Sequence, residues 1–142
     1  MKRQAIFFTI MVLAMPFSAS SQDSWPDPNI PSADHFEAYL QRDLDSYFTA
    51  HEGVTVSVSY EPLRNGPTIT GIAYPKYYLW VSVQSGGKAI DSGAVRVAAV
   101  AGTGFEITDF LSRETILSDP ESVGSIFPAA LVPAIQDRAG RS

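Results

Sequence analysis

The spacing of apolar residues predicts an amphipathic helix over residues 33–50. Its apolar positions are separated by four, four, three and one residues: Phe36, Leu40, Leu44, Tyr47 and Phe48. This spacing places them on one face of a helix. Ser32 precedes the stripe as a candidate N-cap, and Gly53 follows it as a stop signal. We therefore expect one long helix with a single apolar face near the start of the domain.

After Gly53 the period changes to two, which is typical of strands with one wet side. The first strand is expected over 54–61, where Val and Tyr alternate with Ser and Thr. Further strands are expected over 76–84, 93–101 and 105–110, separated by glycine-bearing turns. Residues 68–73 are a candidate for a short edge strand.

From Ser112 onwards the pattern predicts short helices. Ser112 is a candidate cap, and Asp119-Pro120-Glu121 is a helix restart signal. Phe127, Leu131 and Ile135 are spaced by four and should pack onto the domain. The fold class is therefore α+β, with a long N-terminal helix packed on a sheet of three or four antiparallel strands and short C-terminal helices.

This order of elements is similar to the layout of the cystatin-like and NTF2-like architectures. The similarity is one of layout, because cystatins carry a Gln-x-Val-x-Gly loop and Gln84-Ser85-Gly86-Gly87 does not match it. A shared layout does not fix a function.

The first 21 residues have the three parts of a cleavable secretory signal. Lys2 and Arg3 form a basic start, an apolar run follows over 5–14, and the small residues of 18–21 form the exit. The apolar run is shorter than the about 20 residues that span a bilayer. We expect cleavage after residue 20 or 21, a proline-rich extended lead-in over 22–31, and one domain over 32–142. The mature protein is then periplasmic or secreted, without a membrane anchor.

Charge and composition exclude several classes of partner. Removing Lys2 and Arg3 with the leader leaves 8 basic and 15 acidic residues, a formal charge of −7. A scattered acidic surface argues against nucleic acid as a partner. The chain has no cysteine, which excludes a lipidated cysteine and a cysteine zinc site. His35 and His51 are about 24 Å apart along the predicted helix and cannot share an ion. We therefore expect no metal and no cofactor.

No catalytic motif is present, which favours a protein that is not an enzyme. The best enzymatic candidate is Asp109, which strict alternation places on the inward face with Phe105 and Ile107. Burial in a pocket beside Tyr47 and Tyr77 would raise its pKa and make it a general base. The alternative is that the strand has ended at Asp109 and its carboxylate caps the following turn.

Two surfaces are candidates for binding. Tyr78, Trp80 and Arg96 share the sheet face opposite the helix, and these residue types are enriched at interface hot spots. The alternative is that the C-terminal helices cover this face and bury Tyr78 and Trp80 in a second core. The second candidate is the loop 62–75, which is long for a compact domain.

These observations predict a small binding protein that acts by non-covalent contact with a protein partner. An inhibitor or immunity-like protein is the sharpest form of this prediction. One alternative is an NTF2-like small-ligand binder or enzyme with a pocket between helix and sheet. The other is an accessory subunit of an envelope assembly.

Overall fold

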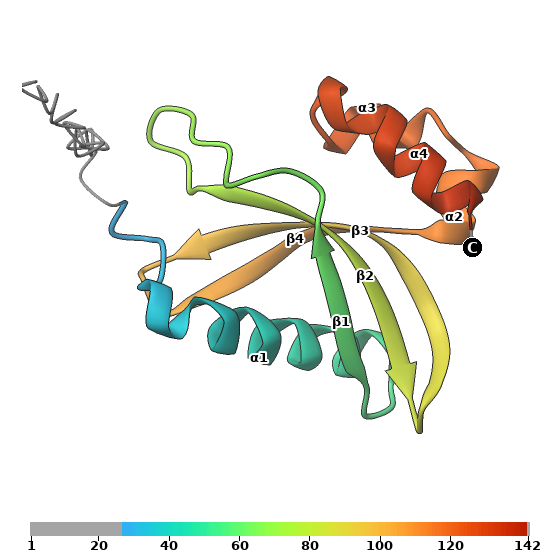
Figure 1. Ribbon diagram of the computed structural model, residues 1–142, viewed down its shortest axis with the longest axis horizontal. Helices are drawn as coiled ribbons and strands as arrows, with labels where there is room; N and C mark the ends of the chain where they lie inside the picture. Colours follow the sequence, from blue (N-terminus) through green and yellow to red (C-terminus); the bar gives the residue numbers. More distant parts are fainter. Residues whose placement is uncertain (1–26, 142) are drawn as a thin grey trace, which may run out of the picture.

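The computed structural model describes residues 27–141, so the predicted signal and most of the proline-rich lead-in lie outside the described residues. The described chain forms a four-stranded antiparallel sheet between two helical layers (Figure 1). The predicted α+β architecture is confirmed. None of the helices in this part of the chain is both long and apolar enough to cross a membrane.

Helix α1 spans Ala33–Glu52 and runs two residues further than the apolar spacing predicts. It buries Leu40, Leu44 and Phe48 against one face of the sheet. Gly53 ends the helix in the left-handed conformation at φ 73°, and its N–H donates to the carbonyl of Thr49. The Ser32 side chain does not cap the helix backbone but hydrogen-bonds the His35 ring at 3.0 Å.

The strands follow one another in the sheet in the order of the chain. Their bounds are β1 Ser57–Pro62, β2 Lys76–Ser85, β3 Lys88–Val100 and β4 Gly104–Ser112. Strand β3 begins five residues earlier than predicted, because it pairs with β2 down to the hairpin turn. The edge strand expected over 68–73 is not formed, and Thr68 alone makes an isolated bridge with Lys76.

Helix α1 is tied to both edge strands by carboxylates on its polar side. Asp45 accepts a hydrogen bond from the N–H of Val58 in β1 at 2.9 Å, and Asp43 accepts one from the N–H of Phe105 in β4 at 2.7 Å. Bonds from a carboxylate to backbone N–H groups are stronger than neutral ones, so they fix the position of the helix across the sheet.

The sheet carries a hydrophobic core on each face, because β3 is apolar on both. The inner face, toward α1, buries Val81, Val83, Val95 and Val97 with the helix stripe. The outer face, away from α1, is covered in part by α2 Arg113–Ser118, α3 Ser122–Ile126, the 3₁₀ turn Ala129–Leu131 and α4 Val132–Gly140 (Figure 1). The second core consists of Tyr78, Trp80, Ala94, Ile116, Val123, Phe127, Leu131, Ile135 and Ala139.

The start of the C-terminal segment is fixed by the predicted cap. The Ser112 hydroxyl accepts a hydrogen bond from the N–H of Thr115 at 3.1 Å. The Asp119-Pro120-Glu121 restart forms a turn, and α3 begins directly after it at Ser122.

Candidate functional site

The predicted binding face at Tyr78 and Trp80 is not open to solvent. The two side chains are 6% and 4% exposed, and the Tyr78 ring contacts that of Phe127 at 6.1 Å. The reason is the apolar stripe Phe127, Leu131 and Ile135, which folds back over the sheet and buries both rings. The expectation of an exposed aromatic surface is corrected, and the structure shows the alternative, a second core.

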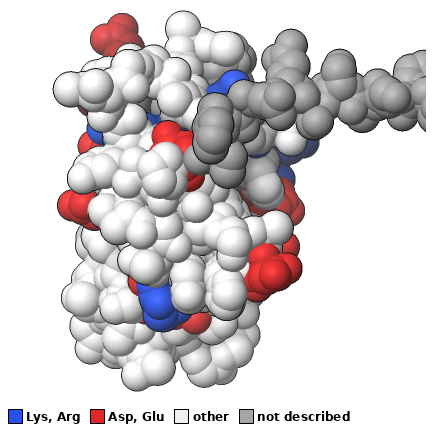
Figure 2. All heavy atoms as spheres, turned by 90° about the vertical axis from the view of Figure 1, so that its left-hand side faces the viewer, with Lys and Arg blue, Asp and Glu red and all other residues white. Residues whose placement is uncertain are grey.

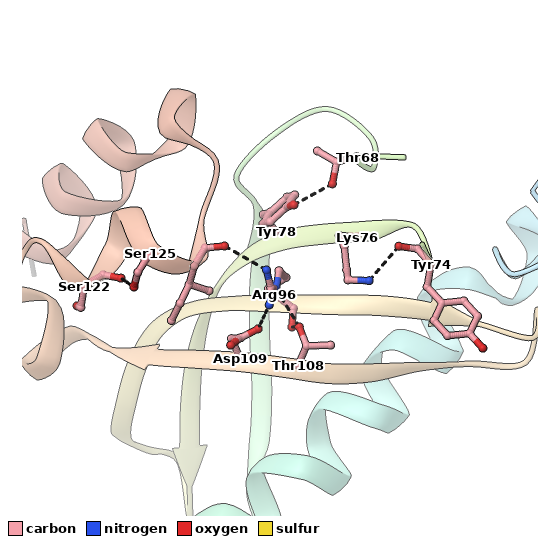
Figure 3. A network of polar contacts seen from close by, with 10 residues as sticks. Thr68, Tyr74, Lys76, Tyr78, Arg96, Thr108, Asp109, Ser122 and Ser125 are labelled. Atoms are coloured by element: carbon pink, nitrogen blue, oxygen red, sulfur yellow. Dashed lines mark hydrogen bonds and ion pairs between the residues drawn. The ribbon is translucent and has the colours of Figure 1, made fainter. Parts of the chain in front are cut away.

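Arg96 connects the sheet to the C-terminal segment through polar contacts (Figure 3). Its guanidinium forms an ion pair with Asp109 at 2.5 Å and donates to the Thr108 hydroxyl at 3.1 Å. It also donates to the carbonyl of Ile126 at 3.2 Å. All three contacts are internal to the molecule, so Arg96 holds the fold together.

The predicted pocket of Asp109, Tyr47 and Tyr77 is corrected as well. Arg96 pairs with Asp109 whereas its neighbour Val97 pairs with Ile107, so Thr108 is an extra residue in β4. Such a bulge reverses the alternation beyond it. Asp109 therefore lies on the outer face, inside a strand that continues to Ser112, and it neither faces α1 nor caps a turn.

Tyr47 and Tyr77 both lie on the inner side of the sheet, but not together. Tyr47 stacks on His51 at 5.9 Å, near the end of α1. Tyr77 contacts the Phe36 ring at 5.1 Å, near the start of α1. Tyr47 on α1 and Tyr77 on β2 therefore lie near opposite ends of α1.

The second predicted surface, the loop between β1 and β2, projects from the sheet (Figure 1). We call residues 63–75 the β1–β2 loop. Of the six large apolar side chains that are exposed in residues 27–141, three lie in this loop: Ile69 is 56% exposed, Tyr74 is 47% exposed and Ile72 is fully exposed. No charged residue occurs between Asn65 and Pro75. The tip is therefore apolar and uncharged.

The stem of the β1–β2 loop is held by hydrogen bonds. Thr68 and Lys76 exchange two backbone bonds of 2.9 and 3.0 Å, and the Thr68 hydroxyl bonds the hydroxyl of Tyr78 at 2.8 Å (Figure 3). The Lys76 ammonium donates to the carbonyl of Tyr74 at 3.0 Å. Because Tyr78 is buried in the second core, the loop is anchored to a rigid part of the fold.

A groove of about 470 Å³ runs along the uncovered part of the outer face. Trp80, Ser82 and Ser92 line it together with Arg113 and Arg138. Both arginines are engaged: Arg138 pairs with Glu61 at 2.7 Å, and Arg113 donates to the carbonyl of Ala139 at 2.8 Å. The first contact joins α4 to β1 and the second joins α2 to α4, so the groove lies between the sheet and the C-terminal helices.

Three side chains in the described part of the chain could hold a divalent ion. Ligand atoms of His51, Glu52 and Asp91 lie within 4.8 Å of one another. The neighbouring Asp91 carboxyl and burial raise the pKa of Glu52, and only the charge of His51 lowers it. Sequence reasoning missed this group because Asp91 comes from β3, whose first residues have no strand pattern.

Neither a family model, a curated protein nor a solved structure matches the chain. The likeness to cystatin-like and NTF2-like proteins is therefore one of element order alone.

Proposed function

We propose that this protein binds another protein outside the cytoplasm and that the tip of the β1–β2 loop is its main contact. The observation that carries the proposal is the cluster of Ile69, Ile72 and Tyr74, exposed together on one anchored projection. A single exposed apolar residue needs no explanation, but three on one loop with an uncharged tip are typical of an interaction site.

The anchoring of the stem favours binding over mere exposure. A loop that is ordered before binding loses less conformational entropy on complex formation. The bonds of Thr68 and Lys76 supply this order at the stem while the tip stays free. A partner with an apolar cleft would receive the tip.

The charge distribution favours a basic partner. Acidic residues outnumber basic ones 15 to 10 in the whole chain. Figure 2 shows charged side chains in small separate groups on a mostly uncharged face. Scattered acidic groups around an apolar contact would speed association with a basic protein.

An inhibitor or immunity-like role is the sharpest form of this proposal, because a projecting apolar loop suits insertion into a cleft of an enzyme. An accessory subunit of an envelope assembly would use the same contact. The two roles differ in whether the partner loses activity when the loop binds. Location outside the cytoplasm rests on the signal-like residues 1–21.

The proposal is tested by placing a photo-crosslinking amino acid at Ile72 in the full chain, expressed in its own cells. The matched control position is Val54, which is 48% exposed and precedes β1, at the end of the strand remote from the loop. We expect one protein crosslinked from Ile72 and not from Val54. Mass spectrometry identifies that protein and also gives the N-terminus of the mature chain.

The crosslinked protein is then titrated with purified variants. The double variant Ile69→Ser/Ile72→Ser should bind at least about tenfold more weakly, because both side chains would lie in the apolar contact. The control variant Val54→Ser/Leu117→Ser removes as many exposed apolar side chains elsewhere and should bind normally. Equal affinities of the two variants would disprove the role of the loop.

A further inference from the structure

A pocket of about 210 Å³ lies between α1 and the sheet, under the start of the β1–β2 loop. Its walls are mainly apolar and include side chains from the helix, from two strands and from the loop. The residues that line it include Phe36, Leu40, Tyr60, Arg64, Tyr77 and Leu79. A pocket between helix and sheet is thus present, and it lies at the start of α1. Of the three residues predicted to line such a pocket, Asp109, Tyr47 and Tyr77, only Tyr77 does so.

Arg64 gives this pocket its chemical character. Its Nη1 atom is enclosed and has no hydrogen-bond partner. Among the described residues, Arg64 also forms no ion pair. A guanidinium stays protonated at every relevant pH and offers paired donors that match a carboxylate. The pocket therefore presents a positive charge without a protein counter-charge.

The other polar side chains that line the pocket are the amide of Asn65 and the phenols of Tyr60, Tyr77 and Tyr78. Burial raises the pKa of Tyr60 and of Tyr77, with smaller contributions from the charges of Glu37 and Asp27. Both phenols are therefore protonated at neutral pH and can donate hydrogen bonds. Neither Glu37 nor Asp27 forms an ion pair with Arg64.

We propose that this pocket binds a small organic carboxylate, with its apolar body against Phe36, Leu40 and Leu79 and its carboxylate on the Arg64 guanidinium. The volume suits a single ring or a short aliphatic chain. The apolar walls disfavour a fully hydrated inorganic anion, because they offer no replacement for its water. This site is separate from the loop tip, and it would exist whether or not the tip binds a protein.

Occupancy of the pocket would also act on the loop. Arg64 belongs to the β1–β2 loop, and Tyr78, which lines the pocket, bonds Thr68 in the loop stem. A carboxylate on Arg64 would fix the first residues of the loop against α1.

The test uses residues 22–142, the chain expected after removal of the signal-like segment, in calorimetric titrations with benzoate and hexanoate. Benzamide and hexanamide are the neutral probes of the same shape. We expect dissociation constants of about 0.1 to 1 mM for the carboxylates. The amides should bind at least about tenfold more weakly, because they lack the charge that pairs with Arg64. NMR shifts on adding benzoate should map to Phe36, Leu40 and Tyr77.

The decisive variant is Arg64→Gln, with Arg141→Gln as a control that removes an exposed arginine elsewhere. Thermal unfolding first establishes that each variant is folded, and Arg64→Lys replaces Arg64→Gln if the latter is not. We expect Arg64→Gln to abolish the preference for carboxylate over amide, Arg64→Lys to retain part of it and Arg141→Gln to retain all of it. The proposal would be overturned if neither carboxylate bound at about 10 mM. It would also be overturned if Arg64→Gln kept the wild-type preference for carboxylate over amide. Loss of protein binding in the loop-tip variant with normal benzoate binding would leave this site intact.

Discussion

Arg96 in β3 and Asp109 in β4 face each other across the sheet with 2.5 Å between Nη2 and Oδ2. The pair exists because Thr108 is an extra residue in β4, which turns Asp109 to the outer face. The Arg96 and Asp109 side chains are 30% and 25% exposed, so the pair is partly shielded from water. It lies where the sheet meets the end of α3.

We expect Asp109→Ala to lower the free energy of unfolding by about 1–2 kcal/mol, because it leaves a half-buried guanidinium without its counter-charge. Arg96→Ala should cost more, since it also removes the bond to the Ile126 carbonyl. The double variant should cost less than the sum of the single ones. Urea denaturation measures all three, and strictly additive values would show that the two groups do not interact.

The stability lost on replacing Trp80, compared with that lost on replacing Tyr74, tests whether Trp80 is a core residue. We expect Trp80→Ala to cost roughly 3–5 kcal/mol, because the ring is buried between the sheet and the C-terminal helices. Tyr74→Ala removes an aromatic ring from the exposed loop and should change stability by less than about 0.5 kcal/mol. Similar losses from the two substitutions would contradict the second core.

Gly93 is required by the close approach of β4. A Cβ atom at this position would lie 2.1 Å from the Leu111 carbonyl oxygen and 2.8 Å from the Phe110 ring. Gly93→Ala should therefore lower the melting temperature by more than about 10 °C, because backbone has to move. Gly124→Ala is the matched control, since no atom lies within 4 Å and the helix α3 gains a better helix former. A thermal melt that finds both variants unchanged would contradict the strand register.

The raised pKa of Glu52 predicts a dependence of stability on pH. Because the folded state holds this proton more tightly than the unfolded chain, stability is lost as pH rises from the ordinary value of 4.5 through the raised one. Glu52→Gln keeps a neutral group there. Its melting temperature should exceed that of the wild type by about 1–3 °C at pH 7 and equal it near pH 4.

The matched control for this experiment is Glu121→Gln, at an exposed position before α3. It should show no comparable gain at pH 7. If the difference in melting temperature between Glu52→Gln and the wild type stayed constant from pH 4 to pH 7, the proximity of Asp91 to Glu52 would not be the cause of that difference.

The local elements could be predicted from the sequence because they depend on local periodicity. The α1 stripe and the alternation in β1 each reflect one buried face, and Ser112 caps the helix that follows it. Strand β3 is apolar on both faces, and the structure shows why: each face is a core.

The candidate sites could not be predicted in the same way, because they depend on the register of distant segments. Thr108 has no feature that marks a bulge, yet it moves Asp109 from one face to the other. The proximity of Asp91 to His51 requires the pairing of β2 with β3. The β1–β2 loop was identified from its length, whereas the exposure of Ile72 and the enclosure of Arg64 are visible only in three dimensions.

The two-sided sheet also sets an order of events during synthesis. A chain emerges from the ribosome N-terminus first. Helix α1 and all four strands are then present before residues 113–141, which cover the outer face. Until those last residues are synthesised, Tyr78 and Trp80 are exposed to solvent on the outer face of the sheet, whereas the inner face can already be covered by α1. The nascent protein therefore exposes an apolar, aggregation-prone surface until its last roughly thirty residues have been synthesised and have folded over the sheet.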